Sequence, residues 1–324
     1  MKNNCLICYN KLSDSEKDYH KVCLKKFFNS EIPPVFDIDE SNLDKTALEM
    51  INKQFSVTGV QPKILLDILK EKQNKIQNER NPKRTLFRIL ESTGNYILKT
   101  QSVQYEQVPE NEDLTMHLAE ICGIKTAKHC LVRLNSGNLA FLTKRFDRKG
   151  KEKIPVEDMC QLTETLTERK YKSSNEKIGK TIDKFSTYPK IDKGIFFDTV
   201  LFSFITGNAD MHLKNYSLMN VNDVVKLTPA YDLLSTKLIL KNLDPEECAL
   251  TINGKKKNLT INDINEFGKN LGLTEIQITN SLKIYSKNKE KLFDKITSSF
   301  LNKNSKKEYI SLLSSNLRLL KIIN

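Results

Sequence analysis

The sequence predicts an α+β fold with two lobes, of which the first is rich in strands and the second is helical. Strand and turn signals dominate up to Arg145, and apolar residues at helical spacing dominate from there to the C-terminus. Apolar residues make up 39% of the 324 residues, which can fill a sizeable core and excludes wholesale disorder. No stretch approaches the ~18 uninterrupted apolar residues of a membrane span.

The first lobe is expected to cover residues 31–145. Its main helix begins near Pro109 and ends at Gly123, with apolar residues spaced by three and four positions. The other elements predicted here are a helix over 43–54, a strand over 64–69 and an exposed basic loop over 70–84.

Two hairpins are predicted in this lobe because turn residues separate short apolar runs. The first joins residues 86–90 to 96–99 through Ser92-Thr-Gly-Asn95. The second joins residues 130–134 to 139–143 through Asn135-Ser-Gly-Asn138.

The second lobe is expected to cover residues 146–324 and to be mainly helical. Residues 197–205 carry apolar side chains at positions i, i+3, i+4, i+7 and i+8, which predicts a buried helix. Two amphipathic helices, near 274–300 and 306–323, close the chain.

The charge balance favours polyanionic partners without naming one of them. Fifty-two Lys and Arg against 40 Asp and Glu leave a net charge of +12, which suits nucleic acid, nucleotide phosphates or an acidic protein. Charged residues run through the first twenty positions, so a secretory signal is not expected. The seven cysteines then predict free thiols in a reducing cytoplasm rather than a disulfide framework.

Residues 1–30 form a predicted separate module with the pattern Cys5-x2-Cys8-x11-His20-x2-Cys23. Two close pairs of such ligands suit a tetrahedral structural zinc site, although the gap between the pairs is shorter than in standard zinc fingers. A segment this small has little core, so a metal can supply folding energy. The alternative is a set of free cytosolic thiols, with Phe27 and Phe28 packing on the first lobe.

The sharpest chemical signal follows the predicted helix over 197–205 and reads Gly207-Asn-Ala-Asp210-Met-His212-Leu-Lys214-Asn215. Asp210 can orient an attacking hydroxyl and accept its proton, and the Asn215 amide oxygen can ligate Mg²⁺. Asp232 follows after a predicted hairpin and offers a second oxygen ligand for the metal. An Asp-x4-Asn, a hairpin and an Asp follow the order of a kinase catalytic loop. Taken alone, Asp-x4-Asn also occurs as ordinary turn residues.

Elements that a nucleotide site needs lie upstream in the expected order. The turn around Gly59 can cover phosphates with backbone N–H groups, and Lys99 ends a strand where it can reach them. Glu110 and Glu112, near the start of the following helix, are both candidate partners of Lys99. Each residue also has a structural interpretation, but the complete set in this order favours phosphoryl transfer.

These segments resemble the HipA family of bacterial toxin serine/threonine kinases. The resemblance spans roughly residues 43–240 in family order. The matching segments are residues 56–63, 96–99, 109–116, 142–148, 170–177, 207–215 and 229–235. The resemblance implies a bilobal protein kinase-like (HipA-like) fold.

The resemblance also implies a role for each matched residue. Asp210 would be the catalytic Asp, and Asn215 and Asp232 would hold Mg²⁺. His212 and Lys214 would share the neutralisation of the γ-phosphate. The implied nucleotide-binding residues are Thr58, Gly59, Val60, Gln61, Lys63, Lys99, Lys144, Phe146, Asn215, Tyr231 and Asp232.

Two departures from the family pattern matter. Lys144 stands where the family hinge usually begins with an acidic residue, and backbone groups of residues 144–146 would still receive the adenine. The chain is also too short for the N-terminal subdomain that docks the antitoxin in larger members. It is more similar to short HipT-type kinases, in which a separate small HipS-like protein supplies that subdomain.

The resemblance further implies autophosphorylation at Ser56, and at Thr58 by analogy with short members. A phosphate adds about −1.5 to −2 charge, so beside the ATP phosphates it would disfavour nucleotide binding. The structural alternative is that both residues are small polar turn residues.

The sequence therefore predicts a cytoplasmic, ATP- and Mg²⁺-dependent serine/threonine kinase, the toxin of a toxin–antitoxin system. The implied partners are a HipB-like HTH antitoxin and a protein substrate, with an aminoacyl-tRNA synthetase leading by family analogy. DNA would be contacted only through the antitoxin, and no membrane is involved. The alternatives are a small-molecule phosphotransferase and a catalytically weak regulatory partner of an HTH protein.

Overall fold

The computed structural model describes residues 3–33, 35–36, 63–70, 85–89, 94–150, 152–241 and 245–323, and within it the side chains of 35–36, 68–70 and 85–89 are not described. The predicted helix over 43–54, residues 71–84 of the predicted loop over 70–84, and the positions Ser56, Thr58, Gly59, Val60 and Gln61 lie outside the described residues. Among the described helices, none is both long and apolar enough to cross a membrane.

The chain divides into two compact units. The first comprises Met1–Asp113 and Lys128–Lys151, and the second comprises Leu114–Ala127 and Glu152–Asn324. The predicted domain limits at residues 30 and 145 remain predictions.

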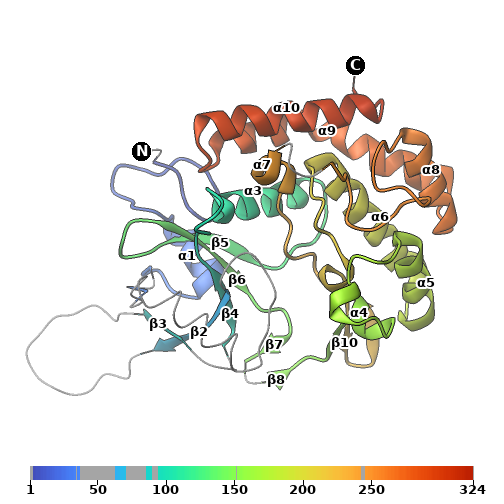
Figure 1. Ribbon diagram of the computed structural model, residues 1–324. Coiled ribbons are helices and arrows are strands. Elements are labelled where there is room, and N and C mark those ends of the chain that lie inside the picture. Colours follow the sequence, from blue (N-terminus) through green and yellow to red (C-terminus); the bar gives the residue numbers. More distant parts are fainter. Residues whose placement is uncertain are drawn as a thin grey trace, which may run out of the picture. The chain divides into compact units, whose positions relative to one another are not determined.

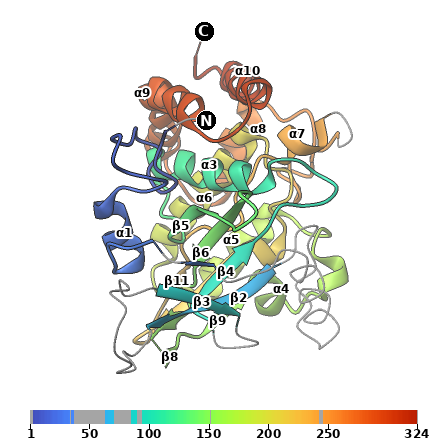
Figure 2. The same cartoon turned by 90° about the vertical axis from the view of Figure 1, so that its left-hand side faces the viewer.

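A six-stranded sheet forms the centre of the first unit, in the order β1-β3-β2-β4-β6-β5 (Figures 1 and 2). Its strands are β1 (Val35–Phe36), β2 (Lys63–Lys70), β3 (Thr85–Ile89), β4 (Tyr96–Lys99), β5 (His129–Arg133) and β6 (Leu139–Lys144). The unit also contains α1 (Lys21–Phe28), the start of α3 (Val108–Ile121) and the short strand β7 (Arg148–Lys149). The predicted strand over 64–69 is confirmed as β2.

The first predicted hairpin is wrong, because β2 lies between β3 and β4. Leu66 of β2 pairs with Ile89 on one side and with Tyr96 on the other. A Cβ atom on Gly94 would lie 2.6 Å from the Leu66 carbonyl oxygen. Gly94 therefore lies directly against the β2 backbone, and β3 and β4 each pair with β2.

The second hairpin and the helix between the two are confirmed. β5 and β6 are antiparallel, with Val132 opposite Ala140, and Gly137 in their connection has a φ of 94°. α3 ends at Ile121, and Gly123 follows with a φ of 84°, which favours glycine as a helix stop.

The second unit is mainly helical and contains a three-stranded sheet in the order β11-β10-β9. Its strands are β8 (Glu152–Lys153), β9 (Val156–Asp158), β10 (Ser217–Val221) and β11 (Val224–Leu227). Its helices are the end of α3, α4 (Met159–Leu162), the 3₁₀ helix η1 (Thr167–Arg169), α5 (Asn175–Phe185), α6 (Pro189–Thr206), the 3₁₀ helix η2 (Leu213–Asn215), α7 (Thr236–Leu240), α8 (Ile261–Asn270), α9 (Glu275–Ser298) and α10 (Lys303–Leu319).

Helix α6 runs through the core of the second unit, as its apolar stripe predicts. Phe197 stacks on Phe267 of α8, with 5.9 Å between ring centroids. α10 lies beside α9 (Figure 1) and also contacts α6, where Asn316 donates hydrogen bonds of 3.1 Å to the Phe204 and Ile205 carbonyls. These contacts fix the C-terminal end of α6, from which the candidate site begins.

Candidate functional site

The loop over residues 207–215 begins where α6 ends. Gly207 has a φ of 68° and the following residue, Asn208, donates its backbone N–H to the Ser203 carbonyl at 2.8 Å. The start of α7 holds the loop, because the Thr236 hydroxyl accepts a hydrogen bond from the Ala209 N–H at 2.8 Å. The loop therefore leaves a rigid helix in a fixed direction.

Asp210 and Asn215 are joined within this loop. The Asn215 side-chain nitrogen donates to the Asp210 carbonyl at 2.9 Å, so the amide oxygen is not used in that bond. The Asp210 N–H in turn donates to the Asn208 side chain at 3.1 Å. A carboxylate suited to take a proton and an amide oxygen suited to Mg²⁺ thus come from one backbone-locked loop.

Tyr171 is a site residue for which the sequence predicted no role. Its hydroxyl donates to Asp210 Oδ1 at 2.6 Å. Burial and the adjacent Asp210 carboxylate raise the pKa of Tyr171 above its ordinary value, so the phenol remains a donor at neutral pH. The resemblance included this segment, but the 39 positions between the two residues gave no sign of the contact.

Replacing Tyr171 by Phe is expected to lower kcat for phosphoryl transfer about tenfold, since a hydrogen bond to a charged group contributes about 1.5–3 kcal/mol. The KM for ATP should change less than about twofold and the melting temperature should hold, because Tyr171 is 41% exposed. Steady-state kinetics and a thermal melt check both. The matched control is Tyr188→Phe, at an exposed tyrosine of the same unit. An unchanged or higher kcat for Tyr171→Phe would contradict the positioning role.

His212 is buried beside Tyr171, with 5.0 Å between the ring centroids. Burial lowers the pKa of His212 and the Lys170 charge acts in the same direction, while the Asp210 and Asp232 carboxylates oppose the shift. The imidazole is therefore neutral near pH 7. Lys214 already forms an ion pair of 2.6 Å with Asp158. That His212 and Lys214 share the neutralisation of the γ-phosphate remains a prediction. With a neutral His212, the positive charge in this pair would come from Lys214.

Hydrogen bonds of the Tyr231 side chain hold the backbone just before Asp232 in place. Its hydroxyl donates to the Lys214 carbonyl at 2.8 Å and lies 2.6 Å from the Ser217 hydroxyl. Asp232 itself has a φ of 59°, which is uncommon for a residue other than glycine and is frequent at functional sites. Because the Asp232 charge acts on His212, this carboxylate belongs to the same region as the loop.

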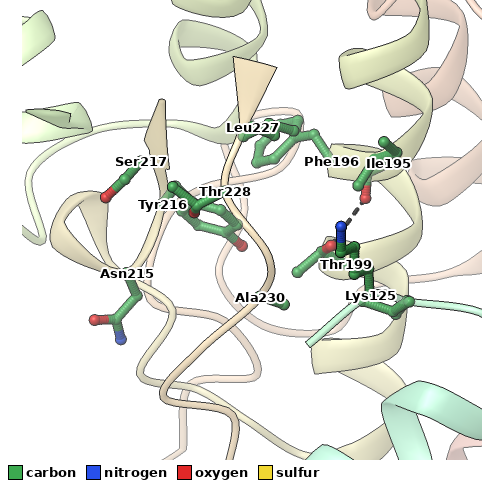
Figure 3. A pocket seen from close by; sticks show the side chains of 11 residues that line it. Lys125, Ile195, Phe196, Thr199, Asn215, Tyr216, Ser217, Leu227, Thr228 and Ala230 are labelled. Carbon is green, nitrogen blue, oxygen red and sulfur yellow. Dashed lines mark hydrogen bonds between the residues drawn. The ribbon is translucent and has the colours of Figure 1, made fainter. Parts of the chain in front are cut away.

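A small pocket of the second unit adjoins the end of the loop, where Asn215 is one of the residues that line it (Figure 3). α6 contributes Ile195, Phe196 and Thr199, and the Asn215 side chain also lines the pocket. Asp210 and Asp232 are not among its lining residues. The pocket therefore does not mark the place where the predicted chemistry would occur.

Lys99 in the first unit forms a buried ion pair with Glu112 at 2.5 Å. Its ammonium also lies 5.4 Å from the centre of the Phe141 ring. The sequence left Glu110 and Glu112 open as partners, and the structure selects Glu112. An ion pair between a strand lysine and a helix glutamate is also found in protein kinases, where it positions the lysine.

Glu110 is left with one buried carboxylate oxygen that has no hydrogen-bond partner among the described residues. Burial, aided by the Asp113 charge, raises the pKa of Glu110 from 4.5 to about 7. Between these two pH values the folded protein binds more protons than the unfolded chain, so the free energy of unfolding falls as pH rises.

We therefore expect Glu110→Gln to stabilise the protein at pH 8 by up to about 3 kcal/mol and to change little at pH 5. Thermal or urea unfolding of wild type and Glu110→Gln between pH 5 and pH 8 checks whether the stability difference grows with pH, as expected. Glu106→Gln, at an exposed glutamate of the same unit, is the matched control. A stability gain that is equal at both pH values would rule out titration of Glu110 as the cause.

Two other implied nucleotide residues of the first unit, Lys63 and Lys144, lie on its sheet, and Phe146 lies in the turn after β6. Lys63 begins β2 and pairs in register with Lys99. In the expected hinge, the Lys144 N–H donates to the Lys128 carbonyl at 2.8 Å and the Arg145 N–H donates to the Asn95 carbonyl at 2.9 Å. These two N–H groups are engaged, so they are not available for adenine. The nucleotide contacts of Lys63, Lys144 and Phe146 remain predictions.

The four N-terminal candidate metal ligands lie together in the first unit. The ligand atoms of Cys5, Cys8, His20 and Cys23 are all within 4.8 Å of one another. The segment packs on the sheet, where Phe27 and Phe28 lie near the Tyr96 ring. Both the ligand cluster and the packing of these two phenylalanines are therefore present.

Residues 55–301 match the family of the HipA-like C-terminal domain. Since this match covers most of the chain, the protein belongs to the HipA-like family. The resemblance inferred from the motifs is thereby confirmed.

Three curated relatives carry kinase names. "Putative kinase Y4dM" of Sinorhizobium fredii is 37% identical over 157 residues, covering 44% of this chain and 38% of that protein. A "Putative kinase" of Haemophilus influenzae is 28% identical over 313 residues, covering 87% of this chain and 83% of that protein. "Serine/threonine-protein kinase toxin HipA" of Shewanella oneidensis is 27% identical over 205 residues, covering 57% and 44%. The chain thus aligns with less than half the length of the first and third relatives.

The fold is similar to that of a solved HipA chain from Shewanella oneidensis, in a complex with HipB and operator DNA. The TM-score is 0.67 at 22% identity, and the match covers 82% of this chain and 65% of that one. This similarity confirms the predicted α+β fold of the HipA type.

Proposed function

We propose that this protein is an ATP-dependent protein serine/threonine kinase. The observation that carries the proposal is the loop in which Asn215 is bonded to the Asp210 carbonyl and Tyr171 holds the Asp210 carboxylate. The kinase names of the relatives support the same reaction class.

In the proposed reaction, a substrate hydroxyl oxygen attacks the γ-phosphorus of ATP while the bond to the β–γ bridging oxygen breaks. Asp210 orients the hydroxyl and accepts its proton, and ADP leaves. The Asn215 amide oxygen and the Asp232 carboxylate suit Mg²⁺, which prefers oxygen ligands and, when bound, neutralises phosphate charge. Lys99 contacts the phosphates, and Tyr171 and Glu112 hold Asp210 and Lys99 in place.

We further propose that the kinase is the cytoplasmic toxin of a toxin–antitoxin system. A HipB-like HTH protein is the proposed antitoxin, since the similar HipA structure is a complex with HipB and operator DNA. DNA is contacted through that partner, and a separate small HipS-like protein is a further proposed partner. The proposed substrate is an aminoacyl-tRNA synthetase, whose phosphorylation would stop translation.

Incubation of the purified protein with Mg²⁺ and ATP, followed by phosphopeptide mass spectrometry, tests the kinase proposal. We expect phosphate at Ser56, with Thr58 as the second candidate, in wild type and not in Asp210→Asn. The absence of any modified residue in wild type, together with no ATP turnover, would contradict the proposal.

A further inference from the structure

The Cys/His cluster of the first unit has the dimensions of a tetrahedral metal site. His20 Nδ1 lies 3.4 Å from Cys8 Sγ and 3.8 Å from Cys23 Sγ, and all four ligand atoms lie within 4.8 Å of one another. Zinc bonds of about 2.3 Å to sulfur and about 2.0–2.1 Å to nitrogen place ligand atoms about 3.5–3.8 Å apart around a tetrahedron. The two separations from His20 Nδ1 are close to these values, and the remaining ligand atoms lie within 4.8 Å of one another.

The local backbone presents the four ligands in two pairs. A tight turn brings Cys5 and Cys8 together, since the Tyr9 N–H donates to the Cys5 carbonyl at 2.9 Å and Tyr9 has a φ of 67°. His20 is the residue preceding α1, and Cys23 lies in the first turn of that helix with its N–H bonded to the His20 carbonyl at 3.0 Å. One turn and one helix start thus supply the site.

The tautomer of His20 also suits a metal ligand. Its Nε2 lies 3.1 Å from the Lys11 carbonyl oxygen. A carbonyl only accepts, so Nε2 carries the proton and the lone pair of Nδ1 faces the thiols. A backbone carbonyl that orients the imidazole in this way is the usual outer support of a histidine ligand.

We propose that Cys5, Cys8, His20 and Cys23 bind one structural Zn²⁺, and that this site anchors the start of α3. Three thiolates and one imidazole at tetrahedral spacing favour zinc among the common divalent metals. The metal-binding part of this inference is independent of the kinase proposal, whereas its consequence for Lys99 rests on that proposal.

Tyr9, the residue after Cys8, links the cluster to α3 by a hydrogen bond. Tyr9 is buried, and its hydroxyl donates to Asp113 Oδ2 at 2.6 Å. The other oxygen, Asp113 Oδ1, lies 2.7 Å from His129 Nδ1 of β5. Asp113 follows Glu112, the partner of Lys99, so the metal loop supports the helix turn that holds this ion pair.

Two further contacts fasten the metal loop to β5. The Leu131 N–H donates to the Leu6 carbonyl at 3.1 Å, and Leu6 lies inside the Cys5–Cys8 turn. Asp18, two residues before His20, accepts hydrogen bonds of 2.7 and 3.0 Å from Arg133. Since β5 belongs to the central sheet, the segment that carries the four ligands is joined to that sheet at two points.

Metal content of the full-length protein is the first test. Purification without chelators and elemental analysis should give about one zinc per chain in wild type and in the control Cys248→Ser, which changes a cysteine outside the cluster. Cys5→Ser/Cys8→Ser should lose the metal. Cobalt exchanged into wild type should give the visible absorption of a tetrahedral thiolate site. Well under one zinc per chain and no cobalt spectrum would overturn the proposal.

A second measurement covers the case in which the cysteine variant does not fold. Removal of zinc from wild type by a chelator should lower the melting temperature by several degrees, and added Zn²⁺ should restore it. Tyr9→Phe should keep one zinc per chain and yet lose ATP affinity several-fold. Full zinc content with unchanged ATP affinity in Tyr9→Phe would overturn only the anchoring role of the site. If wild type itself does not bind ATP, the result would instead count against the kinase proposal.

Discussion

Asp210→Asn is expected to lower the rate of phosphoryl transfer by about 10³-fold, because a positioned general base contributes about 10²–10⁴-fold. The asparagine retains an oxygen that can accept the Tyr171 hydrogen bond and has nearly the same size, so the loop should keep its shape. The melting temperature and the KM for ATP should therefore stay close to those of wild type. Single-turnover kinetics with Mg²⁺ and ATP measure the chemical step directly.

The matched control for Asp210 is Asp223→Asn. Asp223 lies in the turn between β10 and β11 with a φ of 63°, a conformation that asparagine also adopts readily. The same loss of charge at that position should leave phosphoryl transfer unchanged. Equal rates for wild type and Asp210→Asn would exclude Asp210 as the base.

Lys99→Met is expected to destabilise the protein by about 3–5 kcal/mol, because removal of one partner leaves a buried charge without its ion pair. Glu112 is 1% exposed and Lys99 is 5% exposed, so water cannot replace the lost partner. The same change removes the cation that we propose contacts the ATP phosphates, and we expect no measurable phosphoryl transfer. Chemical denaturation and ATP-binding measurements follow the two losses separately.

The double variant Lys99→Met/Glu112→Gln separates stability from function. It removes both charges, so much of the lost stability should return while activity stays absent. Lys241→Met is the control for an exposed pair, since Lys241 and Glu308 lie 3.9 Å apart and their side chains are 70% and 48% exposed. Its free energy of unfolding should change by less than about 1 kcal/mol. Activity in the double variant would contradict the role of Lys99.

Local patterns predicted most elements of the described fold, and tertiary pairing could not be predicted in the same way. The spacing of apolar residues placed α6, α9 and α10, and turn residues placed the β5–β6 hairpin. The same kind of turn signal before β4 was misleading, because β2 pairs with β4 from about 30 positions earlier in the chain. Strand order depends on such distant pairing, which a turn sequence does not report.

For the candidate site too, the sequence predicted candidate residues, and the structure was needed to show their contacts. The spacing of Asp210 and Asn215 predicted a general base and a metal ligand, and the structure shows the hydrogen bond that joins the two residues. Glu110 and Glu112 lie two positions apart and so face different sides of α3, and only the structure shows which side meets Lys99. The neutral state of His212 follows from burial, which the sequence around it did not reveal.

The alternatives to a protein kinase make different predictions about the products. A small-molecule phosphotransferase would turn over ATP without phosphorylating proteins. A catalytically weak regulatory partner of an HTH protein would act through binding, so its effects would survive substitution of Asp210 and Asp232.

Phosphoproteomics after controlled expression of wild type, Asp210→Gln and Asp232→Asn tests the central claim most directly. The proposed kinase predicts growth arrest and new phosphoserine or phosphothreonine sites with wild type alone, among them a site on a component of translation. Equal growth arrest by all three proteins, with no phosphorylation site that depends on Asp210, would contradict the claim.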